Sequence, residues 1–171
     1  MIHVARRVSL VPAIVAAVSV GAFAQSNRID IVTPSAPELA SYGPLSIGVR
    51  TLRVTDRNRP DILNTKEGGA TARYDRTLTV EVWYPATLAP GQKAGGDYRA
   101  MTRDPAITVT LHGQAVRDAS PLTSTPLPLV IISHGYPGNR YLMSHLGENL
   151  ASKGFIVASI DQAAVTPIAT S

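Results

Sequence analysis

Residues 133–138 of this chain read Ser-His-Gly-Tyr-Pro-Gly, and they form the pattern with the clearest chemical potential. They follow an apolar run at residues 129–132 and precede a stretch with helical periodicity. In open α/β sheets, ligands bind outside the carboxyl ends of the strands, so a site is expected at such a turn. Gly135 and Gly138 allow backbone conformations that aim N–H groups into a cleft. Such donors stabilise the negative oxygen formed when an ester or amide carbonyl is attacked, and losing one typically costs roughly 3–4 kcal/mol of barrier.

His134 in this turn has two alternative roles. A general base must stand beside a nucleophile that has been positioned for it, so a structural role at the end of the strand is favoured. A second His-Gly pair at residues 112–113 shows that the dipeptide alone is weak evidence. We interpret that second pair as the end of a strand followed by a turn.

The sequence around the turn predicts a βαβ unit. Residues 129–132 are continuously apolar, which is typical of a strand buried on both faces in a parallel sheet. Residues 140–153 carry apolar side chains at three- and four-residue steps, so we expect a helix there. Asn139 is its expected N-cap and Gly154 its expected left-handed stop. Residues 155–160 form a second apolar strand, and strands joined through a helix are parallel.

The second strand of this unit raises two expectations. It is followed by Asp161, which we interpret as a polar residue at the strand end. No further strand follows at residues 162–171, so we expect the strand 155–160 to leave an apolar edge without its next partner.

The sequence before this unit predicts antiparallel strands. Residues 77–84 alternate in polarity and are closed off by Pro85, which is typical of a half-buried strand. Its apolar face is expected to hold residues 78, 80, 82 and 84, and its polar face Glu81 and Trp83. Looser alternation predicts strands at residues 47–54 and 107–111. The fold class is therefore α/β, with antiparallel strands followed by the opening of a parallel sheet.

Residues 1–24 predict a secretory signal peptide. A basic start with Arg6 and Arg7 precedes an apolar run at residues 8–20, and Ala-Phe-Ala at 22–24 is typical of a cleavage site. The run is shorter than the ~20 residues that span a bilayer, so no stable membrane anchor is expected. We expect a secreted or periplasmic protein cleaved after Ala24.

The composition excludes several classes of protein. The chain has no cysteine, so it is not a small disulfide scaffold and it holds no cysteine nucleophile. The net charge is +4, and the lysines and arginines are scattered, so a nucleic-acid partner is not supported. The sequence has no metal-ligand cluster, phosphate loop or nucleotide fingerprint, so no cofactor or metal is expected.

Three segments, in this order along the chain, resemble bacterial α/β-hydrolases related to platelet-activating-factor acetylhydrolase and dienelactone hydrolase. They are residues 79–85 (Thr-Val-Glu-Val-Trp-Tyr-Pro), residues 127–140 around the turn, and residues 150–158. The resemblance implies a secreted serine hydrolase that acts on carboxylic esters, with lipid and acetyl esters as candidate substrates. It also implies that Tyr136 gives its backbone N–H to the oxyanion hole. In such a loop His134, Gly135 and Gly138 would shape the backbone.

The sequence lacks the catalytic motif that is typical of that family. No G-x-S-x-G nucleophile elbow occurs in it, and the catalytic acid and histidine follow the elbow in the family order, so we assign no catalytic triad residue. Asp161 stands before any elbow, which argues against a role as the catalytic acid. The chain is expected to be inactive alone. The alternative is an exported, non-catalytic binding or interaction domain.

These observations divide the chain into four parts. Residues 1–24 are the predicted signal peptide, and residues 25–46 are a polar lead-in expected to be poorly ordered. Residues 47–161 are the N-terminal part of an α/β-hydrolase domain, an incomplete form of that fold. Residues 162–171 depart from the family pattern, and we expect a truncated or frame-shifted reading frame there.

Overall fold

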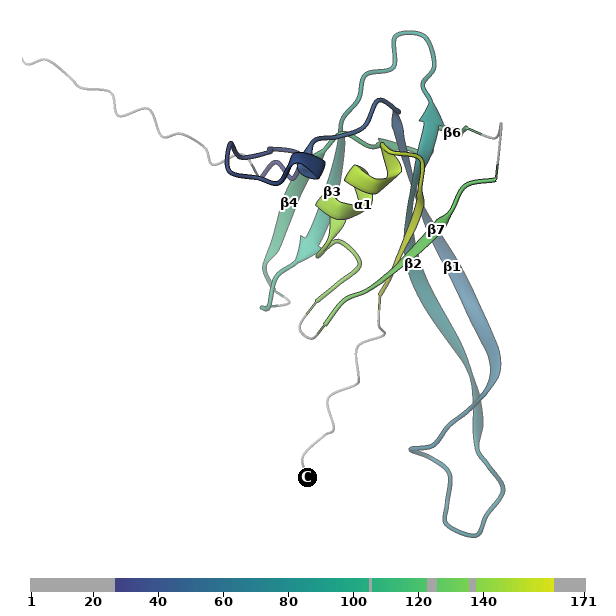
Figure 1. Ribbon diagram of the computed structural model, residues 1–171. Coiled ribbons are helices and arrows are strands. Elements are labelled where there is room, and N and C mark those ends of the chain that lie inside the picture. The colour runs from purple at the N-terminus through teal and green to yellow at the C-terminus, as the bar shows by residue number, and fades with distance from the viewer. Residues whose placement is uncertain (1–26, 105, 123–125, 136–137, 162–171) are drawn as a thin grey trace, which may run out of the picture.

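The computed structural model describes residues 27–104, 106–122, 126–135 and 138–161 (Figure 1). The predicted signal peptide, the divergent tail and Tyr136 lie outside these residues. None of the helices in these ranges has the length and hydrophobicity of a bilayer-spanning segment. The elements, in chain order, are η1 (Glu38–Ala40), β1 (Ile47–Pro60), β2 (Arg73–Thr87), β3 (Gly96–Met101), β4 (Thr108–Gly113), β5 (Val116–Arg117), β6 (Ser120–Pro121), β7 (Leu129–Ser133), α1 (Ser144–Ala151) and β8 (Ile156–Ile160).

One mixed sheet dominates the fold. Its strand order is β5-β1-β2-β8-β7, with β6 paired to the end of β2, while β3 and β4 form a separate hairpin. β1 pairs with β2 in antiparallel fashion, and β7 pairs with β8 in parallel fashion. Antiparallel strands are thus followed by one βαβ unit, so the predicted α/β class is confirmed. This order of elements is the one that the resemblance predicts for an incomplete α/β-hydrolase fold.

The position of β8 corrects one expectation. It was expected to leave an unpaired apolar edge, but it lies between β7 and β2 and pairs with both of them. Its pairing with β2 is antiparallel, from Val80 opposite Ile160 to Trp83 opposite Val157. The strand that ends the sheet on this side is β7. The chain passes from β7 over α1 and returns on the inner side of β7, so the open edge belongs to the earlier strand.

The burial of β7 was also predicted wrongly. The continuous apolar run was expected to be covered on both faces, but Leu129 is 59% exposed and Ile131 is 63% exposed. Val130 and Ile132 point to the other face and pack against the core cluster. Within the described residues, α1 covers that inner face, and the outer face of β7 is open (Figure 1).

The helix α1 is shorter than predicted. It begins at Ser144, and no side chain caps its N-terminus. Asn139, the expected N-cap, instead closes the preceding turn: its Oδ1 accepts the Tyr141 N–H at 2.9 Å. Gly154 has φ +98° and ends the helix as predicted. The Leu150 carbonyl in the last turn accepts the Lys153 N–H at 3.0 Å and the Phe155 N–H at 3.2 Å, so the chain just after the helix closes back on it.

The second half of β2 is buried on both faces, whereas only one was predicted to be. Glu81 and Trp83, placed on the polar face by alternation, have no exposed surface. The indole Nε1–H donates to the Tyr98 hydroxyl at 3.0 Å, and a Cβ on Gly147 of α1 would lie 2.7 Å from the ring. The α1 helix and the β3–β4 hairpin therefore cover a face that the sequence pattern assigned to solvent.

The described part of the lead-in, residues 27–46, contacts the body of the protein. The Ile29 N–H donates to the His112 carbonyl at 2.9 Å, beside β4. The Leu45 N–H donates to the Ser152 carbonyl at 3.1 Å, at the end of α1. This segment thus runs past β4 and α1 before the chain enters β1.

Candidate oxyanion loop and its supports

The turn after β7 lies at the carboxyl edge of the parallel strand pair. β7 ends with Ser133 opposite Ile160, so residues 134 and 135 emerge beside the end of β8. His134 is buried, with 8% of its surface exposed, and its Nδ1 lies 3.0 Å from the Gly135 carbonyl oxygen. A carbonyl oxygen only accepts, so this contact requires the proton on Nδ1. The structure thus brings His134 and Gly135 to the edge where the sequence predicted a site.

Gly138 closes this turn. A Cβ at this position would lie 2.5 Å from the Gly135 carbonyl oxygen and 2.8 Å from the His134 Nδ1. Any side chain would collide with the turn, which explains why the sequence has glycine here. A Cβ on Gly135 would meet nothing within 4 Å, so the backbone at that residue faces open space. The predicted loop residues His134, Gly135 and Gly138 therefore share one tight turn, while the predicted donor Tyr136 lies outside the described residues.

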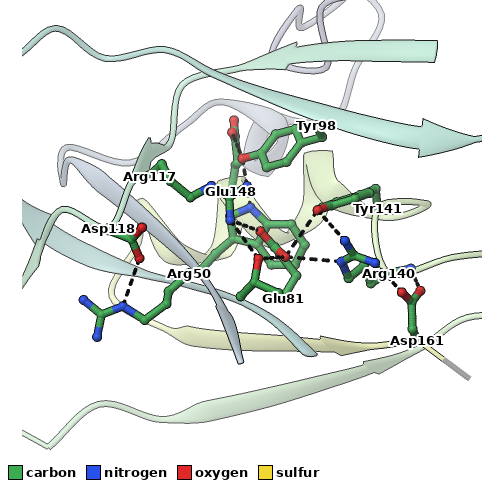
Figure 2. A network of polar contacts seen from close by, with 11 residues as sticks. Arg50, Glu81, Tyr98, Arg117, Asp118, Arg140, Tyr141, Glu148 and Asp161 are labelled. Atoms are coloured by element: carbon green, nitrogen blue, oxygen red, sulfur yellow. Dashed lines mark hydrogen bonds and ion pairs between the residues drawn. The ribbon is translucent and has the colours of Figure 1, made fainter. Parts of the chain in front are cut away.

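Arg140 fastens the end of this turn to β8. Its backbone N–H donates to Asp161 Oδ1 at 2.7 Å, and its guanidinium forms an ion pair with Oδ2 of the same carboxylate (Figure 2). Asp161 directly follows β8, so its carboxylate links the end of β8 to Arg140, which follows the turn. Both ends of the turn are thereby held, the first by the β7–β8 ladder and the second by Asp161. The structure gives Asp161 a positioning role at the strand end.

A buried carboxylate, Glu81 of β2, lies beside Arg140 and binds its guanidinium (Figure 2). Its Oε2 accepts from the Arg140 Nε at 3.3 Å and from the Thr51 hydroxyl at 2.8 Å, and its Oε1 pairs with Arg117 of β5. The Tyr141 hydroxyl lies 3.4 Å from Oε2. A buried charge is costly unless it is paired and hydrogen-bonded, and Glu81 meets both conditions. The network therefore ties the turn to the middle of the sheet.

The tyrosine beside this network stays protonated. Burial, followed by the negative charge of Glu81, raises the pKa of the Tyr141 phenol. Its ring also lies under the Arg140 guanidinium, with 4.4 Å between the guanidinium carbon and the ring centroid. Burial acts to lower the pKa of Arg140, but the contacts with Tyr141 and Asp161 outweigh it and raise that pKa. Arg140 is consequently a fixed cation beneath the turn.

A second buried carboxylate, Glu148 of α1, organises the opposite side of the core. It has no exposed surface, and it accepts from the Tyr98 hydroxyl and from the Tyr42 hydroxyl at 3.0 Å. It also accepts the backbone N–H of Gln114 at 2.9 Å and that of Ala115 at 3.0 Å. Burial, followed by the charge of Glu148, raises the pKa of Tyr98, so this phenol remains a donor. With its oxygens occupied in this way, Glu148 is a structural residue.

The residues that support the turn could not be identified as such from the sequence. Arg140 stands in the segment that carries the family resemblance, but nothing in its spacing identifies Asp161 as its partner. Glu81 falls on the expected solvent face of an alternating strand, so the pattern argues against its burial. Among the described residues, no group of three or more His, Asp or Glu side chains could hold a metal ion.

Replacing Arg140 with alanine is expected to loosen the turn. The substitution removes the guanidinium bonds to Asp161 and Glu81 and leaves only the backbone link. Hydrogen bonds to charged groups contribute about 1.5–3 kcal/mol, so amide exchange in residues 134–141 is expected to accelerate about ten- to hundredfold. Hydrogen exchange followed by mass spectrometry measures this directly. Arg53→Ala, on the exposed part of β1, is the matched control, and equal exchange in both variants would show that Arg140 does not hold the turn.

Comparisons with known proteins agree with this fold. Residues 70–170 match the family model described as platelet-activating factor acetylhydrolase, isoform II. Among solved structures, the chain is similar to a ferulic acid esterase from Streptomyces cinnamoneus, with 28% sequence identity and a TM-score of 0.50. That match covers 74% of this chain and 35% of the esterase, so the chain spans about a third of the length of that protein. No curated protein matches the chain. The family model covers more than half of the sequence and includes β7, the turn and Arg140, so this chain belongs to the platelet-activating factor acetylhydrolase, isoform II family.

Proposed function

We propose that this chain supplies the oxyanion loop of a secreted serine esterase and does not itself hold the catalytic triad. The observation that carries the proposal is the tight turn after β7, closed by Gly138 and anchored to Asp161 by Arg140. It stands at the carboxyl end of a parallel strand, where α/β proteins bind their ligands. Family membership supports ester hydrolysis as the reaction.

In this proposal the Tyr136 backbone N–H donates to the oxygen of the attacked carbonyl. The donor has value only if it is already oriented when negative charge develops on that oxygen. Arg140 and Asp161 would supply this orientation, because they hold the chain just after the loop against the end of β8. His134 and Gly135 would shape the approach from the other end of the loop.

The open edge of β7 fits a missing nucleophile strand. The sequence contains no G-x-S-x-G motif, and in the family resemblance the elbow follows one more helix and strand after the equivalent of β8. Both edges of β8 are already paired, so a further strand on this side of the sheet would pair with β7. Its carboxyl end would then bring a serine next to the oxyanion loop.

The substrate class we propose is a small carboxylic ester. The family description points to acetyl esters of lipids, and the similar Streptomyces protein is described as a ferulic acid esterase. We also propose export, because a basic and apolar leader with a small-residue cleavage site occupies residues 1–24.

Active-site labelling tests the assignment of roles. The 171-residue chain is expected to hydrolyse no p-nitrophenyl acetate and to take up no fluorophosphonate probe, because it offers no serine in a nucleophile elbow. The readouts are a p-nitrophenolate assay and in-gel fluorescence, with a commercial serine esterase as the positive control. Labelling of this chain at one serine would contradict the proposal. A folded, unlabelled chain that binds a specific ligand would favour a non-catalytic binding domain instead.

A further inference from the structure

The hairpin formed by β1 and β2 extends far beyond the body of the protein (Figure 1). All residues of β1 from Arg50 to Pro60 are exposed, and β2 is mostly exposed until Leu78. The part of the hairpin between Arg53 and Thr77 contributes no residue to the two core clusters or to the contacts described for the turn after β7. Its exposure and its distance from the core raise the question of what it contacts.

Two large aliphatic side chains stand at the tip of the hairpin. Ile62 is 84% exposed and Leu63 is 90% exposed, which are the two highest values among the large hydrophobic residues that the structure describes. They are adjacent in the sequence and occupy the turn between the strands. A single exposed leucine is ordinary, but two neighbouring exposed aliphatic side chains form a small apolar patch, and exposed apolar patches mark interaction sites.

Hydrogen bonds hold this tip in shape. The Asp61 carboxylate accepts the Asn64 N–H at 3.1 Å and the Asn64 side-chain amide at 2.7 Å, which closes the turn around the aliphatic pair. The Thr65 hydroxyl accepts the Ala72 N–H at 3.1 Å, which links the tip to the start of β2. Ile62 and Leu63 are therefore displayed by an ordered turn.

The charges of the arm favour an anionic partner. Six basic and four acidic residues lie between positions 51 and 76. Three of the acidic side chains are engaged within the arm: Asp56 pairs with Arg59, Asp61 binds Asn64, and Asp75 accepts the Asn58 N–H at 2.9 Å. Five of the basic side chains have no ion-pair partner among the described residues: Arg53, Arg57, Lys66, Arg73 and Arg76.

We propose that this arm docks on an anionic lipid bilayer, with Ile62 and Leu63 inserted among the acyl chains and the basic side chains placed at the phosphate groups. Aliphatic insertion combined with basic residues is the pattern by which proteins bind a membrane surface reversibly. The tip pair is aliphatic, whereas a single-stranded nucleic acid is held by aromatic side chains that stack on its bases. This surface contact is distinct from a spanning anchor, and it does not depend on ester hydrolysis.

The hairpin edges argue against a second copy of the chain as the partner. The β1–β2 register shifts between Asp56 and Arg59, and Asn58 in this bulge has φ +55°. A bulge with charged neighbours interrupts the row of backbone groups that another strand would pair with. The apolar tip is consequently the part of the arm that is suited to docking.

A single-site fluorescent probe tests this proposal. The chain has no cysteine, so Leu63→Cys gives one labelling site for a nitrobenzoxadiazole dye in the full chain, and Lys93→Cys in an exposed loop gives the matched control. With vesicles of phosphatidylglycerol and phosphatidylcholine at 3:7, the dye at position 63 is expected to shift to the blue and brighten severalfold. The dye at position 93 is expected to stay in water. Because both proteins carry the same leader sequence, a difference between the two positions cannot come from the leader.

A charge variant separates the two parts of the proposal. In the Leu63→Cys background, Arg57→Ser with Arg76→Ser is expected to raise the anionic lipid concentration for half-maximal shift by about tenfold or more, since each basic residue near such a surface contributes to binding. A circular-dichroism melt confirms that the variant is folded. The proposal would be overturned if the protein sedimented with the vesicles while the emission of the dye at position 63 stayed that of a dye in water. A blue shift without vesicles that accompanies a dimer in size-exclusion chromatography would also overturn it.

Discussion

Replacing Glu148 with alanine is expected to lower the free energy of unfolding by about 4 kcal/mol. The substitution leaves the Gln114 and Ala115 N–H groups without their acceptor, and each unsatisfied buried donor costs about 1–3 kcal/mol. The Tyr98 hydroxyl, which also receives the Trp83 indole N–H, loses its acceptor as well. The free energy of unfolding of such domains is only about 5–15 kcal/mol, so the substitution would remove a large part of it.

Two comparisons make this result specific. Glu148→Gln keeps the size and one acceptor oxygen, so its loss is expected to be about half as large. Glu67→Ala, at an exposed position near the tip of the arm, is expected to change stability by less than about 0.5 kcal/mol. Urea unfolding followed by tryptophan fluorescence provides the measurement, because Trp83 is the single tryptophan and lies in the core. If Glu148→Ala unfolded at the same urea concentration as Glu67→Ala, the carboxylate would not organise the core.

The βαβ unit could be predicted from sequence because its signals are local. The apolar run of β7, the helical periodicity after it and Gly154 each act over a few residues, and all three lie close to where they were expected. The strand order could not be predicted in this way. That β8 pairs with both β7 and β2 is decided by contacts between residues far apart in the chain, and periodicity carries no information about them.

Burial was predicted less well than the elements themselves. The apolar run of β7 was expected to be covered on both faces, yet Leu129 and Ile131 are exposed, because coverage depends on which elements pack on the sheet. At Glu81 the prediction was wrong in the other direction, because a residue expected on the solvent face is buried. A carboxylate in an alternating strand normally faces solvent, and its burial here depends on two arginines that come from β5 and from the turn after β7.

The candidate site likewise has a part that could be predicted from the sequence and a part that could not. The glycines of the turn and their place after an apolar strand could be recognised from the sequence, with support from the family resemblance. The residues that hold the turn could not, since Arg140, Asp161 and Glu81 come from three separate parts of the chain. The proposed oxyanion loop is a local motif, whereas its positioning is a property of the whole sheet.

Removing the proposed oxyanion donor is expected to have the largest effect on catalysis. The test requires an active protein, so this chain is joined to the section of the Streptomyces cinnamoneus esterase that follows its matched third. In a chimera that melts cooperatively, Tyr136→Pro deletes the backbone N–H, whereas Tyr136→Ala keeps it. Loss of one oxyanion donor lowers kcat by about 100- to 1,000-fold in related chemistry, and the KM is expected to change little.

The kcat of this chimera for p-nitrophenyl acetate therefore tests the central claim most directly. The account predicts hydrolysis by the parent chimera, a loss of about 100-fold or more with Tyr136→Pro, and less than about a tenfold change with Tyr136→Ala. Equal kcat values for the parent and a folded Tyr136→Pro variant would contradict it, because the turn after β7 would then contribute no donor to the reaction.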